Sequence, residues 1–173
     1  NLSDFWASVW EEVQIKASTP YSVVLEWQSM RNAQWFLGAK LNFAENLLRY
    51  RDQRLALIFQ GEGQTTQKIT YQELYAEVAK LAHALRNCGV QVGDRVTGFM
   101  PNMPQTVIAM LAAASIGAIW SSCSPDFGSN GVLDRFGQIQ PKVLFTANGY
   151  YYNGKAVDCL ARLSEILQEL PSV

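Results

Sequence analysis

The chain of 173 residues has little excess charge of either sign, because 14 Lys and Arg stand against 15 Asp and Glu. Nucleic acids and anionic membranes attract proteins through clustered Lys and Arg. The balance of charge therefore gives no reason to expect either as a partner. With 49% hydrophobic residues, the chain is long enough to bury about two thirds of its unfolded surface, as one globular domain or most of one does.

Cysteine and histidine are scarce. Cys88, Cys123 and Cys159 are odd in number and far apart, with no CxxC pair and no metal-ligand spacing. We therefore expect reduced thiols and a cytoplasmic location. The one histidine, His83, lies about half a turn round from Leu74 on a predicted helix, which puts it on the solvent face. Catalytic triads that need histidine lose their main candidate.

Long hydrophobic runs are also missing. The longest, residues 107–120, is shorter than the roughly 18 residues that a bilayer span requires, and Ser115 and Gly117 interrupt it. No secretory signal pattern is visible at the start, so we expect no membrane partner. The chain begins at Asn1 rather than Met and stops just after a helical pattern, so we expect a piece of a longer polypeptide.

The opening third shows no chemistry of its own. Residues 1–14 have the apolar spacing of an amphipathic helix, with Ser3 as its predicted N-cap. Residues 22–30 indicate a second short helix, residues 35–39 a turn, and residues 42–50 another helix.

The pattern changes at residue 55. Residues 55–70 predict a β-hairpin, and Thr70 with Glu73 forms a capping box for a helix that ends at Gly89. Three strand-to-helix units follow, with strands at 95–100, 118–122 and 143–147. A helix is the usual connection that returns the chain for parallel pairing, so these units predict an α/β fold with a mostly parallel sheet and flanking helices.

In such a sheet, the loops at 100–105, 121–131 and 148–155 emerge together at the carboxyl edge, where open α/β sheets bind ligands. Asn102 is the predicted cap of the first following helix. Ser124, with Pro125 at the first helical position, is the predicted cap of the next. No pair of carboxylates at a fixed spacing is identifiable, so we assign no catalytic residue and no metal ligand.

Residues 149–156, GYYYNGKA, nearly match the phosphate-binding pattern GxxxxGK[ST]. However, three Tyr side chains crowd the segment, and Ala156 lacks the hydroxyl that would hold a metal ion. A stand-alone α/β nucleotide-binding or interaction module with a degenerate P-loop is the alternative hypothesis. Lys155, expected at the start of a helix, either meets a phosphate as a cation or pairs with Asp158.

Two long segments carry a resemblance to a known family: ITYQELYAEVAKLAHALRNCGVQVGDRV at 69–96 and MPNMPQTVIAMLAAASIGAIWSS at 100–122. They resemble the amino-terminal domain of the adenylate-forming acyl-CoA synthetases, the superfamily that includes acetyl-CoA synthetase. Residues 35–48, 112–142 and 152–155 resemble the members that act on acetoacetate. The resemblance implies a helical N-terminal cap over residues 1–50 and the first part of an AMP-binding α/β domain over residues 51–173.

The resemblance implies an acid–thiol ligase. In this family ATP, with Mg²⁺, converts the acid, here acetoacetate, to an acyl-adenylate with loss of diphosphate, and CoA then displaces AMP. The family's Ser/Thr/Gly-rich phosphate loop and its C-terminal catalytic lysine have no match in this sequence. We therefore expect this chain alone to be inactive and to act with the rest of its own polypeptide.

The resemblance also implies site residues. In acetyl-CoA synthetase relatives, the loop that matches Ser124, Pro125, Asp126 and Phe127 contributes to the CoA site, and a basic residue that matches Lys155 meets a CoA phosphate. This sequence departs from those relatives, since Ser-Pro-Asp replaces a glycine-rich turn and Tyr152 stands where a basic residue would fall. Asp126 would repel CoA phosphates unless it faces away.

Overall fold

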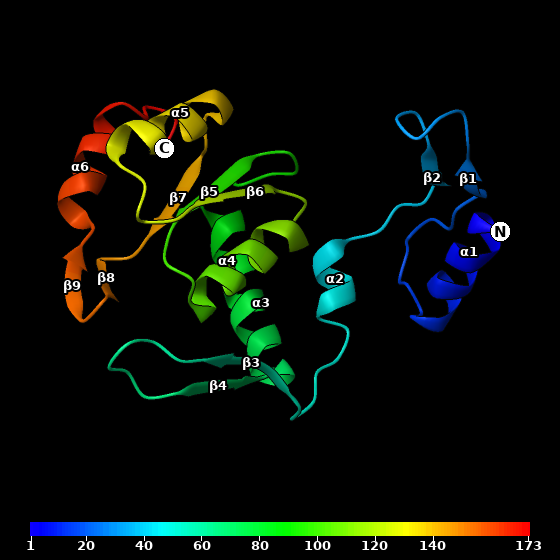
Figure 1. Ribbon diagram of the computed structural model, residues 1–173, viewed down its shortest axis with the longest axis horizontal. Helices are drawn as coiled ribbons and strands as arrows, with labels where there is room; N and C mark the ends of the chain where they lie inside the picture. Colours follow the sequence, from blue (N-terminus) through cyan, green and yellow to red (C-terminus); the bar gives the residue numbers. More distant parts are fainter. The chain divides into compact units, whose positions relative to one another are not determined.

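The computed structural model describes residues 1–173, which form two compact units, Asn1–Arg49 and Tyr50–Val173 (Figure 1). We call them the N-terminal unit and the α/β unit. None of their helices is long and apolar enough to cross a bilayer.

The N-terminal unit contains α1 (Leu2–Glu12), β1 (Val23–Glu26), β2 (Gln34–Leu37) and α2 (Phe43–Leu47). The prediction of a helix over residues 22–30 is wrong, because β1 pairs antiparallel with β2, with Val23 opposite Leu37. Adjacent β-branched residues, Val23 and Val24, favour the extended strand. The segment predicted as a turn supplies the partner strand before the chain reverses at Gly38, whose φ is +79°.

The N-cap of α1 is not the residue that the sequence predicts. Its N-cap is Asn1, whose side-chain oxygen accepts the Asp4 amide at 2.9 Å, and Ser3 lies inside the first turn. The predicted cap at Ser3 is therefore wrong. On the inner face, the Trp10 ring packs on Tyr21 and Phe36, with centroids 5.1 and 4.7 Å away.

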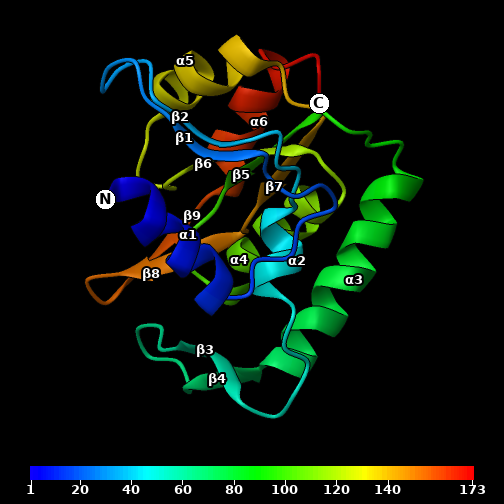
Figure 2. The same ribbon diagram turned by 90° about the vertical axis from the view of Figure 1, so that its right-hand side faces the viewer.

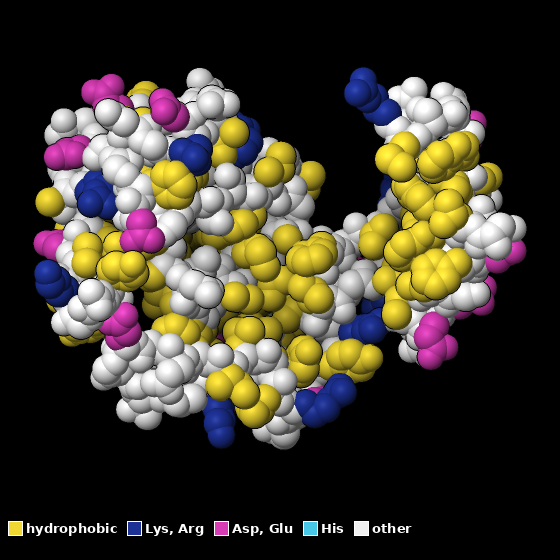
Figure 3. All heavy atoms as spheres, viewed as in Figure 1, with side chains coloured by type: hydrophobic (Ala, Val, Ile, Leu, Met, Phe, Trp, Pro, Cys, Tyr) yellow, Lys and Arg dark blue, Asp and Glu magenta, His cyan; other side chains and the backbone are white.

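The N-terminal unit buries little. Only Ala44 and Leu48 are buried hydrophobic residues in it. Hydrophobic side chains instead spread over the face of this unit seen in Figure 3. The exposed large hydrophobic residues of the unit include Leu2, Phe5, Trp6 and Trp35.

The α/β unit begins with an antiparallel hairpin, β3 (Leu55–Phe59) and β4 (Gln67–Thr70), followed by α3 (Tyr71–Asn87). The predicted capping box is confirmed: Thr70 Oγ1 accepts the Glu73 amide at 3.2 Å, and Glu73 Oε2 accepts the Thr70 amide at 2.8 Å. Gly89, with φ of +78°, ends the helix as predicted. His83 is exposed, also as predicted.

A three-stranded parallel sheet forms the centre of this unit, in the order β6 (Ile119–Cys123), β5 (Arg95–Phe99), β7 (Val143–Thr146). Parallel pairing of β5 with both neighbours confirms the predicted α/β architecture. Figures 1 and 2 show α3 and α4 (Pro104–Ser115) on one side of the sheet, and α5 (Ser129–Ile139) and α6 (Leu160–Gln168) on the other.

The core on the α5 and α6 side forms around Phe99 of the central strand. Its buried members are Phe99, Cys123, Val132, Phe136, Ile166 and Leu170. Thr97, also fully buried, donates its hydroxyl to the Val143 carbonyl at 3.2 Å, so the core holds no unsatisfied side-chain polar atom.

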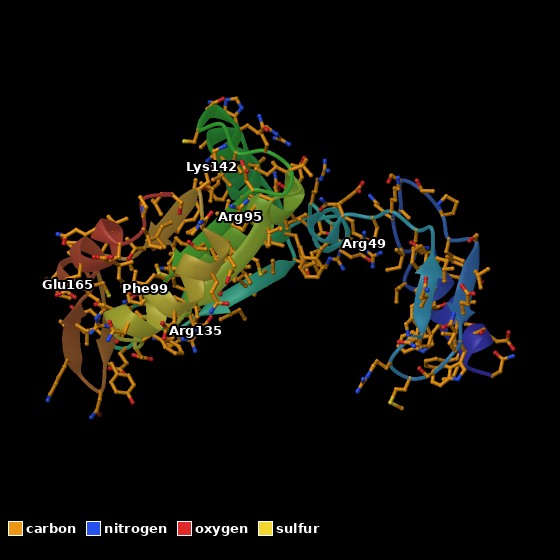
Figure 4. All side chains as sticks on the ribbon, turned by 90° about the horizontal axis from the view of Figure 1, so that it is seen from above. Arg49, Arg95, Phe99, Arg135, Lys142 and Glu165 are labelled. Carbon is orange, nitrogen blue, oxygen red and sulfur yellow. The ribbon has the colours of Figure 1, made fainter.

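Figure 4 shows Arg95 and Lys142 at one end of β5, and Phe99 with Arg135 toward the other. Lys142 Nζ lies 2.9 Å from Asp94 Oδ2, and Arg95 donates to the Ile139 and Gln140 carbonyls. These cations fix the amino end of the sheet and leave its carboxyl edge free for other contacts.

Two predicted caps are wrong. The N-cap of α4 is Met103, not Asn102, and Pro104 takes the first helical position. The N-cap of α5 is Gly128, so Ser124 and Pro125 lie in the preceding loop. Neither helix has a side-chain hydrogen bond at its N-cap. Asn102 and Ser124, the predicted caps, lie in the loops at the sheet edge instead.

The third predicted strand-to-helix unit contains an additional hairpin. Between β7 and α6 lie β8 (Gly149–Tyr152) and β9 (Lys155–Asp158), an antiparallel pair with Tyr152 opposite Lys155. The prediction of a loop over residues 148–155 that leads directly into a helix is therefore wrong.

Candidate functional site

The three parallel strands end level, because Phe99 is in register with both Cys123 and Thr146. The segments that follow them, residues 100–103, residues 124–128 and the β8–β9 hairpin, emerge at this carboxyl edge as predicted (Figure 1). Open α/β sheets bind ligands at this edge. The side chains of the second and third segments form one connected network.

The segment after β6 is a compact polar turn. Ser124 Oγ donates to Asp126 Oδ2 at 2.8 Å, and the Phe127 amide donates to the Ser124 carbonyl at 3.2 Å. The serine thus holds the aspartate of its own turn. This contact is what the Ser124 side chain makes in place of the predicted helix cap.

Tyr150 of β8 joins this turn to the hairpin by donating its hydroxyl to Asp126 Oδ1 at 2.6 Å. The hydrogen bonds from Tyr150 and then Ser124 lower the pKa of Asp126, because they stabilise its charged form. The same bond to a carboxylate, with smaller effects of desolvation and charge, raises the pKa of Tyr150 to about 12. Tyr150 is therefore a neutral donor and Asp126 an ionised acceptor near neutral pH.

Two arginines hold the rest of the turn. Arg162 of α6 donates through Nη1 to the Pro125 carbonyl at 2.7 Å and to the Phe127 carbonyl at 3.1 Å. Arg135 of α5 places its guanidinium carbon 4.2 Å from the centroid of the Phe127 ring, a cation–π contact. The turn of residues 124–127 is thereby connected to α5, α6 and β8.

Sequence reasoning missed Tyr150, Arg135 and Arg162 as members of this network. Arg162 left no readable signal, because its acceptors are backbone carbonyls, which every sequence supplies. From the sequence, Tyr150 is only one of three tyrosines that crowd a phosphate-loop pattern. The spacing of Phe127 and Arg135 crosses a helix start, so no helical periodicity connects them.

Lys155 lies at the first position of β9 and is exposed, not at the start of a helix as predicted. The predicted pairing with Asp158 is also wrong, because no ion pair joins the two side chains. Asp158 Oδ1 accepts the Leu160 amide at 2.7 Å at the beginning of α6. The lysine side chain is accordingly exposed at the tip of the β8–β9 hairpin.

The P-loop hypothesis for residues 149–156 is wrong as well. Asn153 and Gly154, with φ of 50° and 71°, form the two-residue turn of a β-hairpin, and the flanking residues pair as β8 and β9. Asn-Gly is the strongest short hairpin signal, and the GxxxxGK match obscured it. The Asn153 and Gly154 amides donate to the Glu62 carboxylate, so they are not turned toward a phosphate.

Two cavities that share Met103 and Asn148 lie along the edge. One, of about 660 Å³, is bounded by α3, α4 and the end of β7, with Leu81, Ile108 and Phe145 among its walls. The other, of about 480 Å³, lies against the β8–β9 hairpin and includes Gln64, Tyr150 and Asp158. Together they offer an apolar and a more polar compartment, suited to a ligand that has both kinds of surface.

No group of three or more His, Cys, Asp or Glu side chains in the structure is placed to hold a metal ion. The carboxylate within the network, Asp126, already accepts hydrogen bonds from Ser124 and Tyr150. The residues present therefore do not fit a Mg²⁺ site, and we derive no step through that ion.

A parallel α/β sheet with cavities along its carboxyl edge is typical of the class of α/β proteins that bind a ligand at that edge. Within this class, the chain belongs to the AMP-binding enzyme family, whose model matches residues 43–173. Residues 1–47 match the model "Acetyl-coenzyme A synthetase N-terminus".

Individual relatives are similar over almost the whole chain. The acetoacetyl-coenzyme A synthetase of Rhizobium meliloti is 48% identical over 96% of the chain and 26% of its own length. That of Macaca fascicularis is 49% identical over 100% of the chain and 26% of its own length. The solved acetoacetyl-CoA synthetase from Streptomyces lividans superposes with a TM-score of 0.93 at 47% identity, covering 99% of the chain and 27% of that structure. The chain thus spans about a quarter of the length of the relatives it matches.

Proposed function

We propose that this chain is part of an AMP-forming acid–thiol ligase that activates acetoacetate with ATP and transfers the acetoacetyl group to CoA. One observation carries the proposal: acetoacetyl-CoA synthetases from a bacterium and from animals are 48–49% identical to the chain across 96–100% of its length. The matched residues span both units of the chain.

The proposed reaction has two balanced steps. A carboxylate oxygen of acetoacetate forms a bond to the α-phosphorus of ATP as the bond to the β-phosphate bridging oxygen breaks, which gives acetoacetyl-adenylate and diphosphate. The thiol sulfur of CoA then bonds to the acyl carbon, the bond from that carbon to the phosphate oxygen breaks, and AMP leaves while the thiol proton is released. Adenylation is needed because a free carboxylate is a poor electrophile.

Within this reaction we assign the chain to the CoA side. Ser124, Pro125, Asp126 and Phe127 would form one wall of the crevice, and Lys155 would meet a CoA phosphate. Support comes from the rigid connection of this turn to Tyr150 and Arg162 and from the exposed, unpaired ammonium of Lys155. Asp126 faces Tyr150, and this contact turns its charge toward the hairpin.

The sites for ATP and Mg²⁺ we assign to the rest of the polypeptide. The turn amides of the GYYYNGKA segment are used within the protein, and no carboxylate group fits the ion. The contribution of this chain is then to bind and orient the thiol substrate rather than to move a proton or polarise a phosphate.

The complete protein that carries this chain tests the proposal when it is assayed with acetoacetate, ATP and CoA. We expect acetoacetyl-CoA, AMP and diphosphate in equal amounts. Lys155→Ala should raise the KM for CoA about tenfold, the loss of one charge-assisted phosphate contact, with the KM for ATP unchanged.

Lys68→Ala is the matched control, because Lys68 is an exposed lysine of β4 that forms no ion pair. It should leave the KM for CoA unchanged. Formation of ADP in place of AMP, or no thioester product, would refute the ligase function. An unchanged KM for CoA in Lys155→Ala would refute the assignment of Lys155.

A further inference from the structure

The tip of the β8–β9 hairpin is held by an acidic side chain from a distant part of the sequence. Glu62, in the loop between β3 and β4, accepts the Asn153 amide at 3.0 Å on Oε1 and the Gly154 amide at 2.8 Å on Oε2. Figures 1 and 2 both show the β3–β4 loop and the β8–β9 tip side by side. We call this two-bond contact the Glu62 clasp.

The geometry of the turn explains why a carboxylate fits it. Asn153 and Gly154 both have positive φ, so two successive N–H groups point to the same side of the turn. Successive backbone N–H groups of this kind form a concave site for an anion. A carboxylate with two oxygens can accept one bond from each group, and charge-assisted bonds are stronger than neutral ones.

The loop that carries Glu62 is itself braced. Gln60 Nε2 donates to the Gln64 carbonyl at 2.8 Å, and Thr66 Oγ1 donates to Gln60 Oε1. The Gln64 amide donates to the Gly61 carbonyl at 3.3 Å. These bonds span both sides of Glu62, so the loop presents the carboxylate in a defined place rather than on a free chain.

The clasp lies beside the residue that the proposed function depends on. Lys155 directly follows Gly154 and pairs with Tyr152 at the first rung of the hairpin. Gln64, from the same loop as Glu62, lines the 480 Å³ cavity together with residues of β8 and β9. The position of the hairpin tip therefore sets the place of the lysine beside this cavity.

We propose that Glu62 is a positioning residue: its carboxylate acts as an internal anion that fixes the β8–β9 turn and thereby holds Lys155 for a phosphate of CoA. The inference rests on the proposed function. Without the clasp, the two amides would bind water, and the exposed hairpin would sample more orientations. The lysine would then lose more conformational entropy when it binds the phosphate.

The first test measures the clasp without activity. In the chain labelled with ¹⁵N, Glu62→Ala should reduce the hydrogen-exchange protection of the Asn153 and Gly154 amides about tenfold, and Glu62→Gln should reduce it less, because one oxygen acceptor remains. Thr65→Ala, in the same loop, should leave it unchanged. Unchanged protection in Glu62→Ala would overturn the clasp.

The second test uses the complete protein and a double-mutant cycle. Glu62→Ala should raise the KM for CoA about threefold to fivefold with kcat and the KM for ATP unchanged. It should have no further effect in a Lys155→Ala background, where the positioned group is gone. Equal effects of Glu62→Ala in both backgrounds, or a fall in kcat alone, would overturn the positioning role.

The two proposals fail in different ways. If the wild-type complete protein forms no acetoacetyl-CoA, the proposed function is wrong, whatever the exchange data show. If the wild type is active and the clasp is intact, but Glu62→Ala leaves the KM for CoA unchanged, only the role of Glu62 is wrong.

Discussion

At the scale of single residues, Asp126 shows how a polar cluster at a strand end can serve structure. Its two carboxylate oxygens accept from Ser124 and Tyr150, and the carbonyls on either side of it accept from Arg162. The carboxylate thus holds the turn in place rather than acting as an acid or base. Rigid support of this kind is what a binding wall requires.

The hydrogen bond from Tyr150 to Asp126 predicts that the pKa of Tyr150 is raised above its ordinary value. Because the folded pKa of Tyr150 is raised to about 12, its contribution to stability is complete below the ordinary pKa of about 10 and is lost as the pH rises through 12. Asp126→Asn removes the charged acceptor, so the pKa of Tyr150 should fall toward 10. Carbon NMR of labelled tyrosine measures this value directly. Tyr152→Phe is the control and should leave it unchanged. A Tyr150 pKa near 10 in the unmodified chain would contradict the contact.

The pKa of Asp126 shifts in the opposite direction to that of Tyr150. Its folded pKa is lowered, first by Tyr150 and then by Ser124, so its contribution to stability is present above its ordinary pKa and is lost as the pH falls below it. Tyr150→Phe should therefore raise the pKa of Asp126 toward its ordinary value, measured by carbon NMR of labelled aspartate. An unchanged pKa of Asp126 in this variant would contradict the contact.

Hydrogen bonds between residues close in the sequence were predictable, whereas bonds from a side chain to backbone groups far away in the sequence were not. Thr70 and Glu73 form their capping box within four residues, so the sequence alone revealed it. Glu62 and Arg162 bond to backbone groups 91 and 37 positions away, and no local pattern encodes such partners. Ser124 was misread because an N-cap and a self-contained serine turn use the same residue types.

At the scale of elements, β5 is organised around a glycine. Gly98 has β6 and β7 on either side, and the Trp120 ring crosses above it to lie 6.3 Å from the Phe145 ring. A Cβ at position 98 would come within 2.7 Å of the Trp120 ring. The central strand therefore needs a residue without a side chain at this point.

Gly98→Ala should lower the free energy of unfolding by about 1–3 kcal/mol, because the indole must move from a packed position. Gly137→Ala is the matched control: Gly137 lies inside α5 with open space around it, and alanine there should stabilise by about 0.5–1 kcal/mol. Urea titration followed by circular dichroism measures both. A neutral Gly98→Ala would contradict the packing of Trp120.

Element types were predictable where periodicity was long or repeated. The three parallel strands and the helices α3 to α5 follow from apolar runs and spacing. The β1–β2 pair and the β8–β9 hairpin have strands of four residues, too short for a helical or a strand period to be distinguished. In the second case the phosphate-loop pattern also competed with the Asn-Gly turn for the same residues.

At the scale of the whole molecule, the α/β unit supplies a sheet edge with two cavities, and Lys155 is an exposed cation on the hairpin beside them. The polar side chains of Asp126, Tyr150 and Arg162 instead hold the loops of this edge together. The chain spans about a quarter of the length of its acetoacetyl-CoA synthetase relatives. In the proposed function it forms the thiol side of an active site, and the adenylation chemistry falls to the remainder of the polypeptide. The resemblance that supports this reading was visible in long sequence segments, whereas the charges and cavities alone define only a ligand-binding edge.

The most direct measurement follows an oxygen atom through the reaction of the complete protein. Acetoacetate labelled with oxygen-18 in its carboxylate is incubated with ATP and CoA, and the products are analysed by mass spectrometry. If the acid is activated as an adenylate, one labelled oxygen must appear in AMP, because the bond from the acyl carbon to that oxygen breaks when CoA attacks. Label in inorganic phosphate with formation of ADP, or AMP without label, would contradict the adenylate-forming ligase.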